Sequence, residues 1–200
     1  MNRRRAIAAL ALAAGAAILP LRAGAQAGKV RRVGFISGAF AALYYDAFLA
    51  GMADLGYVEG KNVVFHKRFG ENQDELGAAL INERPDLIVA AGGAAVRAVQ
   101  KTPHPVPVVF SFSGDPVAAG FVKSLAQPGG NISGISLMSL ELVGKRMELL
   151  RESVPNLRKV AILANPEHPG AQLERSTSIA SANALGLEHI YFQVQKPAEL

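Results

Sequence analysis

Short apolar runs recur along this chain, and segments with helical spacing separate most of them. Strands are expected at 30–37, 62–68, 86–91, 106–112, 132–136, 159–164 and 189–194. Helices are expected at 44–55, 74–82, 94–101, 140–154 and 170–185, with a short one near 121–126 and with Ser139 capping the start of the helix at 140–154. Strands that alternate with helices of this length predict βαβ units and parallel sheets, so the fold class is α/β.

The N-terminus has the pattern of an export signal. Three arginines at 3–5 precede an apolar run at 6–19, and Ala23-Gly24-Ala25 supplies a small-residue cleavage pattern. We therefore expect residues 1–25 to be a signal peptide, with export to the periplasm by either the general or the twin-arginine route. The apolar run is shorter than the roughly 20 residues that a membrane-spanning helix needs.

Composition excludes several classes of function. The chain has no cysteine, which removes disulfides, thiolate metal sites and cysteine nucleophiles. Four of its 21 basic residues lie in the first 25, which leaves 17 against 16 acidic residues in the body of the chain. A body so close to neutral gives no electrostatic reason to expect nucleic-acid binding.

Parallel sheets bind ligands outside the carboxyl ends of their strands. The segments that follow the expected strands are rich in Gly, Ser, Asp and Asn, which permit tight turns and expose backbone N–H groups. They are Ser37-Gly38, Gly92-Gly93-Ala94, 111–120 and Asn165-Pro166. This edge of the sheet is the expected binding edge.

No catalytic or cofactor motif occupies these loops. The segment Gly34–Ala39 lacks the spacing of a dinucleotide-binding turn, and no phosphate-binding loop or nucleophile elbow occurs in the chain. The histidines at 66, 104, 168 and 189 show no metal-ligand spacing and are interpreted as surface or loop residues. We therefore expect no enzyme activity, no cofactor and no metal.

Two features leave alternatives open. Asp115, between Gly114 and Pro116, either caps the turn that follows or accepts hydrogen bonds from a ligand's ammonium group. Tyr44 and Tyr45 either flank a ligand or pack the first helix.

Five stretches resemble one family in order. They are RRVGFISG, DAFLAGMADLGYVEGKNV, PDLIVAAGGAA, PVPVVFSFSGDPVAAGFVKSLAQPGGNISGIS and GKRMELLRESVPNLRKVAILANPEHPG. The family is that of ABC-transporter substrate-binding proteins of the tryptophan/tyrosine-binding type, and the resemblance covers nearly all of residues 30–200.

The resemblance implies a periplasmic-binding-protein fold of type I, in which two Rossmann-like lobes hold a small solute in a cleft and present it to a membrane permease. It implies a first lobe at 26–136, a second at 137–200, and an amino acid or related organic acid as ligand. Carried over by position, the ligand-binding residues are Ser37, Gly38, Gly92, Gly93, Ala94, Ser113, Asp115 and Asn165. Many relatives have Gly-Thr or Gly-Ser where this chain has Gly92-Gly93, so the missing hydroxyl points to an altered carboxylate contact or a different ligand.

Relatives of this kind run to about 300 residues, two α/β domains. The resemblance therefore implies that the chain is truncated at its C-terminus and that the second lobe is incomplete. The alternatives from other classes are a ligand sensor that acts on a signalling receptor and an enzyme on a flavodoxin-like α/β fold.

Overall fold

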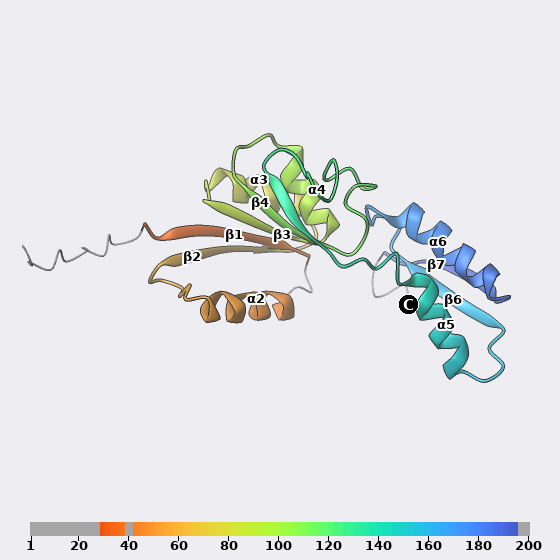
Figure 1. The fold of residues 1–200 in the computed structure, drawn as a ribbon. Coiled ribbons are helices and arrows are strands. Elements are labelled where there is room, and N and C mark those ends of the chain that lie inside the picture. Colours follow the sequence, from red (N-terminus) through yellow and green to blue (C-terminus); the bar gives the residue numbers. More distant parts are fainter. Residues whose placement is uncertain (1–28, 39–41, 196–200) are drawn as a thin grey trace, which may run out of the picture.

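The computed structural model describes residues 29–38 and 42–195, and these form two α/β lobes (Figure 1). The larger sheet has five strands in the order β2-β1-β3-β4-β5, and every neighbouring pair is parallel. Its strands are β1 (Arg31–Ser37), β2 (Val63–Phe69), β3 (Leu87–Ala91), β4 (Val108–Phe112) and β5 (Ile132–Ser136). The α/β class and the parallel sheet are confirmed.

The strand order reverses between β1 and β3. The chain passes from β1 to β2 on one side through α2 (Ala42–Asp54), then crosses back to β3 through α3 (Gln73–Asn82). Consequently α2 lies on one face of the sheet, and α3 lies with α4 (Gly93–Lys101) on the other (Figure 1). In sheets of this order, ligands bind beyond the carboxyl ends of the strands at the reversal point.

Each face of the first lobe has its own packing. On the α2 side, aromatic rings fill the space, with Phe35 of β1 centred 4.9 Å from Tyr45 and 5.2 Å from Phe48. On the other side, aliphatic residues such as Leu80, Val96 and the β-strand residue Ile88 are fully buried. Burial of such side chains supplies about 1.5–3 kcal/mol each, which holds the strand ends in fixed positions.

The second lobe is a two-stranded parallel sheet with two helices. It consists of α5 (Val143–Ser153), β6 (Lys159–Ala164), α6 (Ala171–Ala184) and β7 (Glu188–Gln193). Its small core joins Val160 to Ala182 and Leu187. Apolar side chains remain exposed on the open face of its sheet, among them Leu163, Ile190 and Phe192.

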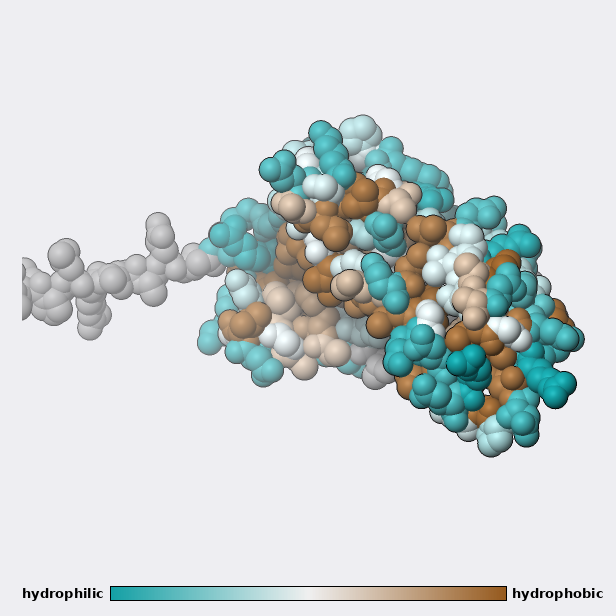
Figure 2. Space-filling view, turned by 45° about the vertical axis from the view of Figure 1, so that its right-hand side comes forward, coloured by the Kyte–Doolittle hydropathy of each residue, from teal (hydrophilic) through white to brown (hydrophobic). Residues whose placement is uncertain are grey.

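The surface view shows hydrophobic residues on the visible face of both lobes (Figure 2). The interlobe segment itself carries exposed side chains of this kind, including Leu137, Met138 and Leu142.

A short crossing segment connects the lobes after β5. Its backbone continues the pairing with β4, because the Leu137 N–H donates to the Phe112 carbonyl at 2.8 Å and the Ser139 N–H donates to the Ser113 carbonyl at 3.1 Å. Met138 between them has φ of 49°, an uncommon value for a residue with a side chain. The chain turns from one lobe to the other at this point.

Two details of the expected structure are wrong. Residues 121–126 form no helix, and a turn at 116–120 precedes them. The reason is tertiary packing: Phe121 and Val122 are both buried, and the Phe121 carbonyl accepts a hydrogen bond from the Gln100 side chain. Ser139 does not cap the following helix, because α5 begins only after Leu142, with no side-chain cap; the Ser139 N–H instead donates to the Ser113 carbonyl just beyond β4. The other expected elements are present with ends shifted by at most three residues.

Candidate functional site

A cleft opens at the reversal point of the first sheet. It has a volume of ≈ 360 Å³ and is called the switch-point cleft below. From the first lobe it is lined by 37–38, Tyr44 and 91–95, and from the second by Asn165 and 167–169. Both lobes therefore contribute walls to one cavity at the position where the topology places a ligand.

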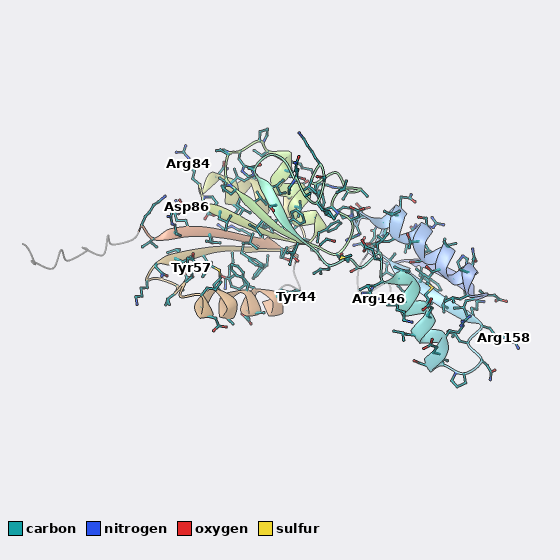
Figure 3. The ribbon with its side chains drawn as sticks, viewed as in Figure 1. Tyr44, Tyr57, Arg84, Asp86, Arg146 and Arg158 are labelled. Atoms are coloured by element: carbon teal, nitrogen blue, oxygen red, sulfur yellow. The ribbon has the colours of Figure 1, made fainter. Side chains whose placement is uncertain are left out.

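Tyr44 stands at the rim of this cleft. Tyr44 lies in α2, is 70% exposed, and stands at the end of the first lobe that faces the second (Figure 3). Tyr57 and Asp86 lie at the opposite end of the lobe (Figure 3). Of the two tyrosines, Tyr45 packs in the core and Tyr44 lines the cleft.

Glycines shape the floor of the cleft. Gly92 has φ of 99° and ψ of 150°, a backbone conformation that is essentially restricted to glycine. A Cβ atom on Gly93 would lie 2.7 Å from Pro169 Cγ and 2.7 Å from Phe112 Cε2. The absent hydroxyl at this position therefore has a steric reason: the second lobe packs where a side chain would be.

The polar groups of the floor are mainly backbone amides. The Ser37 hydroxyl donates to the Ala91 carbonyl at 2.8 Å, so this hydrogen bond links the ends of β1 and β3 and uses the hydroxyl's proton. Helix α4 begins with no side-chain cap, because Gly92 precedes it. The first N–H groups of a helix have no partner within the helix and favour anions. The amides of Gly93 and Ala94, which line the cleft, are therefore a candidate anion contact.

The second lobe supplies acceptors opposite them. Asn165 Oδ1 accepts from the Glu167 N–H at 2.9 Å, which fixes the tight turn after β6. The Glu167 side chain is exposed and lines the cleft, so its carboxylate can meet a cation there.

Asp115 lies in a second, adjoining cleft of ≈ 290 Å³. One of its carboxylate oxygens accepts from the N–H groups of Val117 at 2.8 Å and Ala118 at 3.1 Å. This is the capping alternative for Asp115. Asp115 also lines the adjoining cleft together with Arg97 and is half-buried, so the capping contact leaves the residue partly accessible.

Ser113 contacts the second lobe directly. Its Oγ lies 3.2 Å from His168 Nε2, and the His168 ring stacks on Phe112 with centroids 5.3 Å apart and an interplanar angle of 22°. His168 lines both clefts.

The structure thus divides the expected binding residues into two groups. Six of them line the switch-point cleft: Ser37, Gly38, Gly92, Gly93, Ala94 and Asn165. Asp115 belongs to the adjoining cleft, and Ser113 contacts His168.

Sequence reasoning missed Glu167 and His168. The sequence pattern predicts an ordinary surface or loop histidine at 168, whereas its stacking on Phe112 and its contact with Ser113 place it at the junction of the lobes. The signal that could have found it is its place in NPEHPG, directly after a strand's carboxyl end.

Neither metal nor membrane features appear in the described ranges. Residues 29–38 and 42–195 contain no cluster of acidic or histidine side chains able to hold a metal ion. Within the same residues, each helix is too short or too polar to cross a bilayer.

Comparison with known proteins gives one family. The family model of the ABC transporter substrate binding protein matches residues 29–200. A tyrosine-binding protein of Clostridioides difficile (strain R20291) is 27% identical over 132 residues, which are 64% of this chain and 37% of that protein.

Solved structures share the fold. A conserved domain protein from Vibrio cholerae superposes with a TM-score of 0.77 at 27% identity, over 86% of this chain and 60% of that one. An ABC domain from Streptococcus pneumonia in complex with L-Trp gives a TM-score of 0.72 at 23% identity, over 84% and 59%. The chain therefore spans between about a third and three fifths of the length of these relatives.

Proposed function

The chain belongs to the ABC transporter substrate-binding protein family, and on that premise we propose that it binds a small amino acid-like solute in the switch-point cleft and delivers it to a membrane permease. The observation that carries the proposal is the cleft itself, whose walls come from both lobes at the reversal point of a parallel sheet. Binding proteins need such a two-walled cavity, because closure of the lobes encloses the ligand.

The chemistry of the walls suits a zwitterion. The first-turn amides of α4 offer hydrogen bonds to a carboxylate, and the helix dipole favours negative charge at that end. Across the cleft, the Glu167 carboxylate is the acidic group among its lining residues and pairs with an ammonium group. Tyr44 at the rim offers an aromatic face to the ligand's side chain. These contacts support an amino acid, and the ligand named for the Clostridioides difficile relative makes L-tyrosine the first candidate.

Delivery, location and domain limits are part of the same proposal. Export through a signal peptide at 1–25, which lies outside the described residues, places the protein in the periplasm, where it meets a permease. The lobes are assigned to 26–136 and 137–200. The ligand is bound and released unchanged, with no cofactor and no chemical step.

Calorimetric titration of the full-length protein with L-tyrosine, L-tryptophan and a panel of other amino acids tests the proposal. Glu167→Gln removes the negative charge at constant shape and is expected to weaken amino-acid binding about tenfold, in keeping with the loss of a charge-assisted hydrogen bond. Glu152→Gln, at an exposed position of α5, is the matched control and should bind as the wild type does. If only solutes without an amino group bind, or if Glu167→Gln binds amino acids unchanged, the ammonium contact is wrong.

A further inference from the structure

One side chain of the second lobe, that of His168, makes both a ring contact and a hydrogen bond to the first lobe. His168 extends from the loop after β6 and lays its ring against Phe112, the last residue of β4, at 5.3 Å between centroids. Phe112 is 1% exposed, so the surface that receives the imidazole is part of the first lobe's core. An aromatic contact of this kind adds stability beyond the area that it buries.

Hydrogen bonds fix the orientation of the ring. Nε2 lies 3.2 Å from Ser113 Oγ. Nδ1 has two neighbours on its own lobe: the Gly170 N–H at 3.3 Å, and Glu174 Oε1 at 3.2 Å. A neutral ring that carries its proton on Nε2 donates to Ser113 and accepts from Gly170, and a protonated ring donates to Ser113 and Glu174. The interlobe bond to Ser113 is therefore compatible with both protonation states.

Ser113 also connects this contact to the crossing segment. Its carbonyl accepts from the Ser139 N–H at 3.1 Å, next to Met138 with its φ of 49°. One residue of the first lobe thus contacts the second lobe through its side chain and the interlobe segment through its backbone.

We propose that His168 is the positioning residue that holds the second lobe on the first and so sets how easily the switch-point cleft closes around a ligand. The stack on Phe112 and the bond to Ser113 join the lobes in the arrangement in which both of them line the switch-point cleft, so they lower the free energy of this arrangement relative to arrangements in which the lobes separate. A ligand that contacts both walls then needs less of its binding free energy to bring the lobes together. The same loop, through 167–169, lines both clefts and separates them.

The distance between the lobes can be measured without any ligand. This chain has no cysteine, so Asp54→Cys on α2 and Ala184→Cys on α6 accept one spin label each, and both positions are exposed. In the full-length protein, pulsed electron–electron double resonance measures the distance between the two labels, and we expect His168→Ala to shift its distribution to longer separations. Ser113→Ala, which removes only the hydrogen bond, should give a smaller shift in the same direction, and His168→Phe, which keeps the stack, should restore part of the short-distance population.

His189→Ala is the matched control, because it removes a histidine of the second lobe that lies away from the two clefts at the lobe junction. If His168→Ala gives the same distance distribution as His189→Ala, the proposal is wrong. If His168→Ala loses its cooperative thermal transition, Ser113→Ala decides, and an unchanged distribution in that variant overturns the proposal.

The consequence for binding rests on the proposed function: His168→Ala should weaken binding of the probe L-tyrosine about tenfold. The two ideas fail separately. If the wild type binds no amino acid but His168→Ala still changes the lobe distance, the proposed ligand class is wrong and the positioning role stands. If the wild type binds L-tyrosine but His168→Ala leaves the lobe distance unchanged, only the positioning role is wrong.

Discussion

Adding one methyl group at Gly93 tests whether the lobes meet as the structure shows. An alanine Cβ at this position would lie 2.7 Å from Pro169 Cγ, 2.9 Å from Pro169 Cδ and 2.7 Å from Phe112 Cε2. Separations below about 3 Å are far inside the carbon–carbon contact distance, so neighbouring atoms must move. The Phe112 ring can tilt within its own lobe, but the rigid Pro169 ring can retreat only with the loop that carries it.

Gly93→Ala therefore strains two contacts, one in each lobe. Overpacking of this kind costs about 1–3 kcal/mol. The part due to Pro169 falls on the packing of the second lobe against the first, and the part due to the buried Phe112 ring falls on the first lobe itself. Gly93 is the first residue of α4, and its φ is not among the positive values, so alanine fits the backbone. The packing of the lobes should become up to about 150-fold less favourable.

Two measurements on the full-length protein separate these effects. Chemical denaturation should show a small decrease in the unfolding midpoint from the strain on Phe112, and titration with L-tyrosine should show weaker binding. The control is Gly51→Ala, in the middle of α2, where an added Cβ meets nothing within 4 Å. Binding by Gly93→Ala that is as tight as binding by Gly51→Ala would refute the close packing of Pro169 on α4's first turn.

Two further predictions concern stability. The buried Gln73 amide donates to the Ser37 carbonyl at 2.9 Å and to the Gly70 carbonyl, so Gln73→Met should lower the free energy of unfolding by about 1–3 kcal/mol. Gln73→Glu should lower it further at neutral pH, because a carboxylate would face two carbonyl oxygens. Equal losses for the two variants in urea denaturation would contradict this. The hydrogen bond from Lys29 holds the pKa of the Asp86 carboxyl below its usual value. The contribution of Asp86 to stability is therefore present above the unfolded-state pKa and is lost as the pH falls through the folded-state pKa. The difference in unfolding free energy between wild type and Asp86→Asn should shrink on acidification, and a difference that stays constant from pH 7 to pH 2 would disprove the link.

Local pattern was sufficient for most of the fold. Apolar strand runs such as 159–164 and glycine stops such as Gly186 depend on near neighbours in the chain, so element type and order could be predicted from them. The helix predicted at 121–126 is absent because the conformation of this segment depends on tertiary contacts. Phe121 packs in the core against Phe112, and the Gln100 side chain of α4 donates a hydrogen bond to the Phe121 carbonyl. Neither contact can be read from local periodicity.

The candidate site was predictable where topology alone decides. Ser37 and Gly92 had to lie near each other, because parallel strands end at a common edge. The position of Asp115 in a separate cleft, and the role of His168, depend on how the second lobe packs on the first. His168 lies 55 residues from Ser113 in the chain, and no spacing rule links two loops of different lobes.

The strand order also implies an order of assembly. Each strand of the larger sheet finds its partners within Arg31–Ser136, and each crossover joins neighbouring parts of the chain. A chain that emerges N-terminus first can therefore finish this sheet before Asn165 has emerged, and domains commonly fold one after another in this way. The switch-point cleft is then completed late, only when the loop that carries His168 packs on a lobe that has already folded.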